Sequence, residues 1–292
     1  MSIRPSNSPQ STKSSQAELA EWGSAALAAT SSTPRLDAEL LLAFSLAKSR
    51  SAIFAFPEQV VETEKADRYR KLIRRRSAGV PLAYLTGNKE FYSLDFEVTS
   101  ATLVPRPETE LLVDIAIERS SQQPQPRILD LGTGCGAIAF AIKQTKPSCI
   151  VTAVDISPAA LAVAQRNAER LSLDVRLIES NWFESLDDSS YDVIVTNPPY
   201  VARDDLDSSP ELACEPTRAL DGGRDGLDEI RLILAEAASR LAPGGFLIME
   251  HGHDQGKDVI DLAGNGGFVT SEIVTDLAGL DRALVAQAAA GS

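Results

Sequence analysis

Apolar residues recur at two spacings along this chain, and the change between them divides it. From residue 16 to residue 79 leucines and alanines return every three or four positions, the spacing of helices that bury one face. Thr33-Pro34 adds a helix cap followed by a proline suited to a first helical position. The helices expected here cover residues 16–29, 35–42 and 57–77, with a short segment at residues 51–56 before the last of them. We therefore predict a small helical bundle over residues 16–79.

Aromatic and large apolar residues crowd the stretch that follows, residues 80–104. Gly79-Val80-Pro81 breaks the helical pattern, and Gly87-Asn88 punctuates the apolar run. We predict a β-hairpin linker that packs against both neighbouring domains.

Short apolar runs then alternate with helical patterns. The expected strands are residues 127–131, 149–154, 175–178, 191–196 and 245–250, and the expected helices are 111–120, 137–145, 158–171 and 225–241. Repeated strand and helix predict an α/β domain, residues 105–288, with a doubly wound, mostly parallel, Rossmann-like sheet. Ligands of such sheets bind beyond the carboxyl ends of the strands. Asp130, Asp155, Asn181-Trp182 and Asn197 all lie at or just after those ends.

Composition narrows the classes of function. The formal net charge of −13 over 292 residues disfavours binding to a phosphate backbone. Arg74-Arg75-Arg76 sits in a mixed-charge helix, and we favour a solvated face over a nucleic-acid patch. Three widely spaced cysteines predict reduced thiols in a cytoplasmic protein and argue against a disulfide framework or a metal site. No membrane span or signal peptide is expected.

The two ends of the chain carry little patterning. Residues 1–15 are rich in Ser, Pro, Gln and Thr, which predicts a disordered tail. The small residues from Ala288 to Ser292 predict a second tail.

Asn197-Pro198-Pro199-Tyr200 follows a buried strand and is the most informative stretch of the chain. Two prolines fix two φ angles and remove two backbone donors, leaving a stiff loop that presents an Asn side chain and carbonyl groups. Such a loop can hold a planar –NH2 group by accepting its two hydrogens. Taken alone, the motif could equally be a turn that leaves the strand.

Gly132-Thr133-Gly134-Cys135-Gly136 forms a glycine turn that lets the backbone approach a ligand closely. Asp155 ends the next strand, where a carboxylate can accept both hydroxyls of a ribose. A dinucleotide site also combines a glycine turn with a ribose-binding carboxylate. This chain, however, has G-x-G-x-G where the dinucleotide fingerprint is G-x-G-x-x-G, and the negative charge of Asp130 would repel a diphosphate. The Asp130 carboxylate suits an amine-bearing cation instead. We favour S-adenosylmethionine over the dinucleotide of a dehydrogenase.

These motifs together resemble the HemK/PrmC protein-glutamine methyltransferases. The resemblance covers nearly the whole chain. It is carried by residues 81–87 (PLAYLTG), 103–110 (LVPRPETE), 129–137 (LDLGTGCGA), 197–200 (NPPY) and 250–252 (EHG). It implies a class I S-adenosylmethionine-dependent methyltransferase that acts on the Gly-Gly-Gln glutamine of bacterial class I peptide chain release factors.

The resemblance also assigns roles to residues. It implies a cofactor loop at Gly132–Gly136, a ribose carboxylate at Asp155, adenine contacts near Trp182, substrate binding by Asn197–Tyr200, and a helical domain that holds the release factor. Asp130 and Asn197 are further cofactor candidates, and Arg106 and Glu108 are substrate candidates. Cys135 departs from the family pattern, in which a hydroxyl residue is usual, and we expect little consequence because the backbone binds there.

A carboxamide nitrogen is a poor nucleophile and too weak an acid for a side-chain base to deprotonate. Our hypothesis is that the Asn197 side-chain oxygen and the Pro198 carbonyl accept its two hydrogens and aim the nitrogen at the methyl group. Tyr200 would either pack against the glutamine stem or anchor the loop.

The sequence leaves several alternative functions and residue roles open. A nucleic-acid adenine-amine methyltransferase shares the Asn-Pro-Pro-Tyr chemistry, and a non-catalytic donor-binding protein is the third possibility. The helical domain could be a structural cap, and Trp182 a core residue. His251 is expected to be structural. The sequence assigns no roles within residues 215–225. We expect a monomer that does not contact nucleic acid directly.

Overall fold

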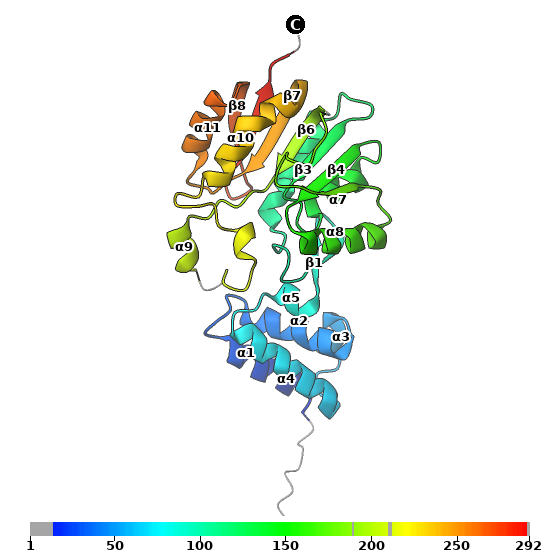
Figure 1. Ribbon diagram of the computed structural model, residues 1–292. Helices are drawn as coiled ribbons and strands as arrows, with labels where there is room; N and C mark the ends of the chain where they lie inside the picture. Colours follow the sequence, from blue (N-terminus) through cyan, green and yellow to red (C-terminus); the bar gives the residue numbers. More distant parts are fainter. Residues whose placement is uncertain (1–13, 189, 210–211, 291–292) are drawn as a thin grey trace, which may run out of the picture. The chain divides into compact units, whose positions relative to one another are not determined.

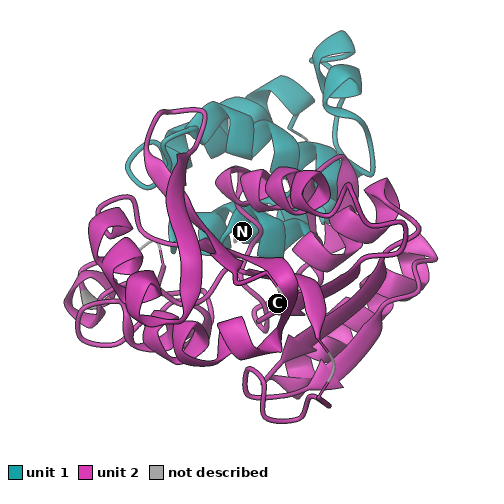
Figure 2. Ribbon diagram, turned by 90° about the horizontal axis from the view of Figure 1, so that it is seen from above, with its two compact units in different colours: residues 1–86 teal, residues 87–292 magenta. Residues whose placement is uncertain are grey.

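The chain divides into two units, Met1–Thr86 and Gly87–Ser292, which Figure 2 colours separately. The computed structural model describes residues 14–188, 190–209 and 212–290. None of the helices within these ranges is both long and apolar enough to cross a membrane.

The first unit is helical (Figure 1). Its helices are α1 (Gln16–Leu27), α2 (Pro34–Leu46), α3 (Arg50–Ala55), α4 (Thr63–Ser77) and α5 (Leu82–Thr86). Leu19, Leu41, Tyr69 and Leu85 are among the buried residues of its core, which draws on α1, α2, α4 and α5. The apolar spacing read from the sequence thus corresponds to faces that are buried inside this unit.

Two boundaries in this unit differ from the prediction. Helix α4 begins at Thr63 rather than at residue 57, because residues 57–61 bond to the chain just before and within α1: Ala17 N–H donates to Pro57 O and Val61 N–H donates to Ser14 O. Ser15, predicted to lie in a disordered tail, caps α1 by accepting from Glu18 N–H. Residues 1–13 of that predicted tail lie outside the described residues.

The predicted hairpin is present but shorter than expected. Residues 82–86 form helix α5, because Pro81 precedes a Leu-Ala-x-Leu spacing that suits a helical turn. The hairpin itself is β1 (Asn88–Phe91) paired antiparallel with β2 (Leu94–Glu97). Its turn is Tyr92-Ser93, both with positive φ, and Gly87-Asn88 lies at the start of β1. Glu110 accepts the Tyr92 N–H at 2.7 Å, which satisfies a donor of this strained turn.

The second unit contains the predicted α/β sheet. Its strands are β3 (Arg127–Leu131), β4 (Ile150–Asp155), β5 (Arg176–Glu179), β6 (Tyr191–Thr196), β7 (Leu241–Glu250), β8 (Phe268–Thr275) and β9 (Asp281–Ala288). They are ordered β5-β4-β3-β6-β7-β9-β8. Strands β5, β4, β3, β6 and β7 pair in parallel, whereas β9 runs antiparallel to both β7 and β8. The Rossmann-like, mostly parallel fold class is therefore confirmed.

Helices connect and cover these strands. They are η1 (Pro107–Thr109), α6 (Glu110–Arg119), α7 (Ala137–Thr145), α8 (Pro158–Leu171), α9 (Arg203–Asp207), η2 (Thr217–Ala219), α10 (Asp228–Arg240) and α11 (Gly256–Asn265). The sequence patterns do not predict α11, β8 and β9. Ala288, predicted to begin a tail, instead pairs with Phe268 at the end of β9.

The strand order creates one switch point that matters for function. From β3 the chain proceeds to β4 and β5 on one side, and it returns to place β6 on the other side of β3. Loops that leave β3 and β6 therefore diverge, and a crevice opens between them at the carboxyl edge. Leu129 and Ile194, which pair across β3 and β6, are fully buried, so the two strands hold this edge rigidly.

Candidate active site

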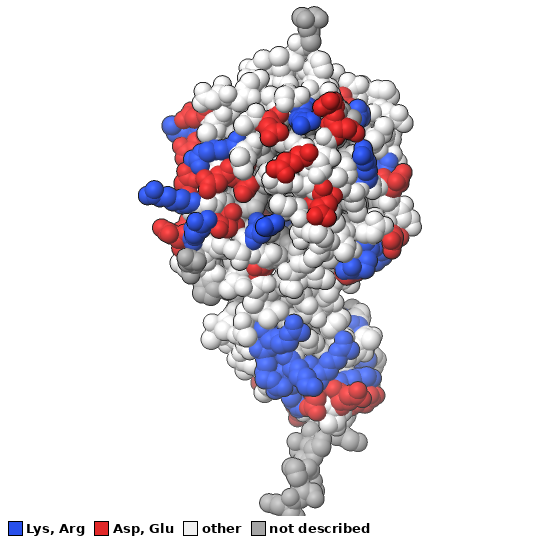
Figure 3. All heavy atoms as spheres, viewed as in Figure 1, with Lys and Arg blue, Asp and Glu red and all other residues white. Residues whose placement is uncertain are grey.

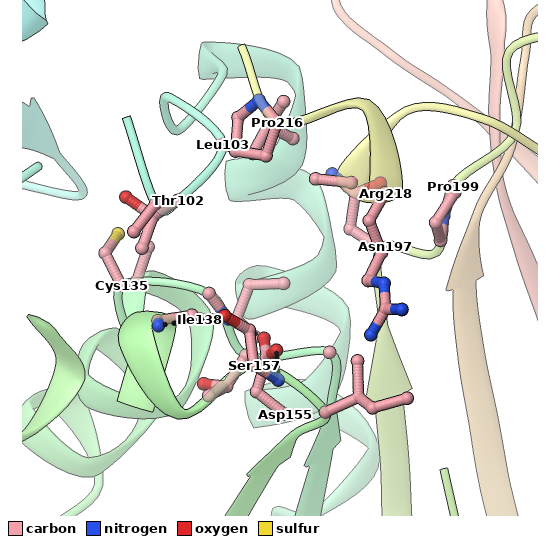
Figure 4. Close-up of a pocket in the computed structure, with 18 of the residues that line it drawn as sticks. Thr102, Leu103, Cys135, Ile138, Asp155, Ser157, Asn197, Pro199, Pro216 and Arg218 are labelled. Atoms are coloured by element: carbon pink, nitrogen blue, oxygen red, sulfur yellow. Dashed lines mark hydrogen bonds between the residues drawn. The ribbon is translucent and has the colours of Figure 1, made fainter. Parts of the chain in front are cut away.

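A cavity of about 340 Å³ opens at the carboxyl ends of β3, β4 and β6. This volume is within the range of small-molecule sites. Figure 4 shows Asp155 and Ser157 on one side of it and Asn197 and Pro199 across from them. Residues predicted separately from distant stretches of sequence, including Gly132–Cys135, Asp155, Trp182 and Asn197, line this one cavity.

The glycine turn after β3 is shaped by positive φ angles. Gly132, Gly134 and Gly136 have φ of 69°, 59° and 88°, a region that side chains disfavour. A Cβ at Gly136 would lie 2.1 Å from the ring of Phe140, so the turn could not carry a larger residue there without rearrangement. The turn therefore brings backbone close to the cavity and closes directly onto helix α7.

Asp155 ends β4 and faces the glycine turn. Its Oδ2 accepts Gly134 N–H at 2.8 Å, and its Oδ1 accepts Ser157 N–H at 2.9 Å. Burial raises the pKa of Asp155, while these two backbone bonds oppose the rise. Each oxygen keeps a further lone pair, so the carboxylate can accept two hydroxyl groups of a ligand in the cavity.

Trp182 forms a flat apolar wall of the cavity. Its backbone has φ of 48°, an uncommon conformation for a large residue. Its indole Nε1 donates to Glu229 Oε2 at 2.7 Å, and its ring lies against Gly132, where an added Cβ would be 3.3 Å away. The indole is thus held in one orientation, as a surface for a planar ring would need to be.

Asn197 leaves β6 at the start of the proline-stiffened loop. Its Nδ2 donates to Thr109 Oγ1 at 3.1 Å, and both residues line the cavity. Pro199 lines the cavity as well. Because the amide nitrogen is committed to Thr109, the side-chain oxygen is the group that remains to accept a ligand's hydrogen.

Arg106 lines the cavity and forms an ion pair with Glu215, whose side chain is 2% exposed. The other oxygen of Glu215 accepts Val104 N–H at 3.0 Å. One buried carboxylate therefore ties residues 104–106 to the loop after β6. The sequence patterns assign no role to any residue of that loop. In the structure Pro216 and Arg218 line the cavity, and Glu215 holds residues 104–106 beside it.

Asp130 does not line the cavity, contrary to the prediction that its carboxylate would contact the ligand. It is fully buried beneath the glycine turn, where its Oδ2 accepts the Thr133 hydroxyl at 2.6 Å and Ala139 N–H at 3.2 Å. Burial raises its pKa to about 7. Asp130 is the second-last residue of β3, and its side chain is directed toward the glycine turn and helix α7, where both of its hydrogen-bond partners lie.

Other predicted residues also lie outside the lining: Gly136, Pro198, Tyr200 and Glu108. Glu108 is exposed in the first turn of η1, and Pro198 is buried. Tyr200 turns its hydroxyl to Glu250 Oε1 at 3.0 Å. Gly136 contributes through the shape of its turn. These placements follow from tertiary packing, which the motif spacing does not encode.

His251 is fully buried outside the lining, and its Nδ1 lies 2.8 Å from Gly252 O. Burial lowers its pKa. Within the described parts of the chain, no group of three His, Cys, Asp or Glu side chains could hold a metal ion.

The residues present fit S-adenosylmethionine. The glycine turn leaves room for close backbone approach, the free lone pairs of Asp155 suit vicinal hydroxyl groups, and the fixed indole of Trp182 suits an adenine ring. The cavity continues from these residues to Asn197, where a methyl group could meet a second substrate.

Comparisons with known proteins identify the family of this chain. Residues 107–262 match the family model described as the methyltransferase small domain, and residues 18–87 match the PrmC N-terminal domain. The release factor glutamine methyltransferase of Moorella thermoacetica is 44% identical over 257 residues, which are 87% of this chain and 91% of that protein. The protein of the same name from Pseudomonas aeruginosa is 44% identical over 259 residues, 88% of this chain and 94% of that protein.

Solved structures with a similar fold are more distant in sequence. A methyltransferase from Pyrococcus furiosus has a TM-score of 0.51 and 18% identity, covering 78% of this chain and 100% of that one. The hMettl16 catalytic domain, solved with an RNA hairpin, has a TM-score of 0.56 and 15% identity, covering 78% and 84%. At these identities the likeness concerns the fold alone.

Proposed function

This chain belongs to the release factor glutamine methyltransferase family, and on that premise we propose that it methylates the glutamine of the Gly-Gly-Gln motif in class I peptide chain release factors. It is an S-adenosylmethionine-dependent protein-glutamine N-methyltransferase. The observation that carries the mechanism is that Asn197 lines the same cavity as the glycine turn and Asp155, with its amide nitrogen already bonded to Thr109.

Bound S-adenosylmethionine supplies a methyl group on a positively charged sulfur. We propose that Asp155 holds the ribose hydroxyls, Trp182 contacts the adenine, and the turn at Gly132–Gly136 supports the remainder. These contacts orient the donor and do not act on the nitrogen that receives the methyl group.

The acceptor side of the reaction depends on Asn197. Its Oδ1 accepts one hydrogen of the glutamine –NH2 group. The second acceptor that we propose is the carbonyl of Pro198; the Pro198 side chain is buried outside the lining, but the neighbouring Asn197 and Pro199 both line the cavity. Two acceptors fix the plane of the amide and stabilise the positive charge that grows on nitrogen as the new bond forms. Alignment of two bound reactants can lower a barrier by up to ~7–11 kcal/mol in favourable cases. As the carbon–nitrogen bond forms, the methyl carbon would part from the donor sulfur, which would keep the electron pair and leave as a neutral thioether. The nitrogen then loses one proton to solvent.

The helical unit is proposed to bind the release factor, because the acceptors and donor contacts described above all lie in the second unit. Since release factors act in translation, we propose that the protein works in the cytoplasm, as a monomer.

The direct test offers three samples the same labelled methyl donor: purified class I release factor, DNA, and both together. Mass spectrometry of the Gly-Gly-Gln peptide should find one methyl group on the glutamine side chain, with no label on DNA. Label on DNA adenine would favour the nucleic-acid amine methyltransferase instead, and label on neither would leave the protein a donor-binding module.

A further inference from the structure

Behind Asn197 lies a chain of hydrogen bonds that the proposed chemistry does not yet use. Asn197 Nδ2 donates to Thr109 Oγ1 at 3.1 Å, and Thr109 Oγ1 donates to Glu250 Oε2 at 2.7 Å. Tyr200 donates to the other oxygen of Glu250 at 3.0 Å. Thr109 and Glu250 are 4% and 1% exposed, so water has little access to these bonds.

The direction of these bonds is set by a single proton. The Thr109 hydroxyl has one hydrogen to give. Burial raises the pKa of Glu250, and the hydrogen bonds from Thr109 and Tyr200 oppose the rise by favouring the ionised carboxylate. In that form Glu250 can only accept, so it takes the Thr109 hydrogen. Thr109 Oγ1 therefore presents a lone pair to Asn197. Only the nitrogen end of the Asn197 amide can satisfy that lone pair, so the oxygen end turns to the other side.

An asparagine amide rotated by half a turn would present –NH2 to the substrate's –NH2 group, and two donors cannot bond to each other. The two orientations fill almost the same space, so packing alone separates them poorly. A fixed hydrogen-bond partner does separate them, at the cost of an unsatisfied buried group in the wrong orientation.

We propose that Thr109 and Glu250 are positioning residues, which hold the Asn197 amide with its oxygen toward the acceptor nitrogen. Thr109 comes from η1 and Glu250 ends β7, so two segments 141 residues apart in sequence meet behind Asn197. The inference rests on the proposed function of Asn197 and names the groups that make it effective. It also gives a role to Thr109 of the LVPRPETE motif and to Glu250 of the EHG motif, neither of which is proposed to contact the methyl donor.

The test replaces Thr109 by valine, which keeps the shape and removes the hydroxyl, and by serine, which restores it. Thr109→Ala is made alongside, in case valine prevents folding. The control is Thr145→Val, at the end of α7; among the described residues its hydroxyl bonds to the helix carbonyl of Ala141, at 2.8 Å, and to no other group. For each variant, kcat and KM with release factor and the donor Kd by calorimetry are measured.

We expect kcat of Thr109→Val to fall about 10- to 100-fold, with KM and donor Kd within about threefold of wild type. Thr109→Ser should recover most of kcat, and Thr145→Val should match wild type. In an Asn197→Ala background the Thr109→Val change should have no further effect, because the amide it orients is gone.

Wild-type kcat in both Thr109→Val and Thr109→Ala would overturn the proposal, and so would an undiminished effect in the Asn197→Ala background. A loss confined to donor Kd would also overturn it. If wild-type protein itself failed to methylate release factor, the proposed function would fall first, so the two failures are distinguishable.

Discussion

Trp182 donates its indole N–H to Glu229 over 2.7 Å, and this bond links the loop after β5 to the first turn of α10. Both residues line the cavity. The sequence predicts Trp182 as a residue of the cofactor site but does not indicate Glu229. Since a hydrogen bond to a charged acceptor is worth about 1.5–3 kcal/mol, the carboxylate should contribute measurably to the orientation of the indole.

Glu229→Ala should therefore weaken donor binding about 5- to 20-fold, because the freed indole loses its fixed orientation. Isothermal titration calorimetry with S-adenosylmethionine measures the effect. Glu229→Gln is the control, since its side-chain oxygen can still accept the indole N–H, and it should bind nearly as well as wild type. Equal losses in both variants would mean that the carboxylate itself contacts the donor.

The parts of the fold that the sequence predicted are those in which a local pattern determines the structure. Buried strands such as Tyr191–Thr196 are continuous β-branched runs, and parallel strands must end at one edge. This reasoning placed Asp155, Trp182 and Asn197 at the same edge, and the structure brings all three to one cavity.

The parts that the sequence did not predict depend on packing between distant segments. Asp130 and Asn197 both lie at or just after a strand end, yet only Asn197 reaches the cavity, because the pleat turns Asp130 inward. Thr109 and Glu215 have no periodic pattern around them that points to a site. Thr109 belongs to the LVPRPETE motif, and that motif by itself predicts only the start of a helix.

Asp130 should make folding depend on pH. Burial raises its pKa in the folded protein to about 7, above its ordinary value of 3.8. Between these pH values Asp130 keeps a proton in the folded state that it has released in the unfolded state. The contribution of Asp130 to the free energy of unfolding is therefore greatest below about pH 4 and is lost as the pH rises to 7. The full loss from this group is on the order of 4 kcal/mol.

Urea unfolding of Asp130→Asn and wild type at pH values from about 4.5 to 7.5 isolates this contribution. Asparagine does not titrate, so the difference in unfolding free energy between the two proteins should shift in favour of the variant as pH rises. Parallel pH profiles for the two proteins would mean that Asp130 is ionised throughout that range.

Glu215 should stabilise the wall of the cavity opposite Asp155. Its removal in Glu215→Ala leaves Val104 N–H and Arg106 without their buried partner, and we expect a loss of roughly 2–3 kcal/mol in the unfolding free energy. KM for release factor should rise as well, because both tied segments line the cavity. Glu215→Gln keeps an acceptor for Val104 N–H and should lose less unfolding free energy. An unchanged KM in Glu215→Ala would show that this wall of the cavity does not contact the substrate.

The basic face of α4 should matter for the release factor. Residues 87–292 carry 33 Asp and Glu against 16 Lys and Arg, whereas residues 14–86 carry eight against ten. Figure 3 shows Lys and Arg gathered on one face of the helical unit. Among the described residues, Lys71, Arg74 and Arg75 of α4 form no ion pair, which leaves them available to a partner.

Reversing the charge at Lys71, Arg74 and Arg75 should raise KM for intact release factor at least fivefold and leave kcat on a short Gly-Gly-Gln peptide unchanged. The control reverses the charges of Glu21 and Glu58, exposed residues of the same unit that lie outside α4. An unchanged KM for intact release factor would show that this face is only solvated.

The central claim is that the Asn197 oxygen acts on the acceptor amide and is not needed to hold the donor. The measurement that tests it most directly is the single-turnover rate of methyl transfer to release factor by Asn197→Ala at saturating S-adenosylmethionine, with the donor Kd determined by calorimetry on the same sample. We predict a rate lower by about 100- to 1,000-fold and a Kd within a few-fold of wild type. A near-normal rate per bound donor together with a collapsed donor affinity would contradict the account.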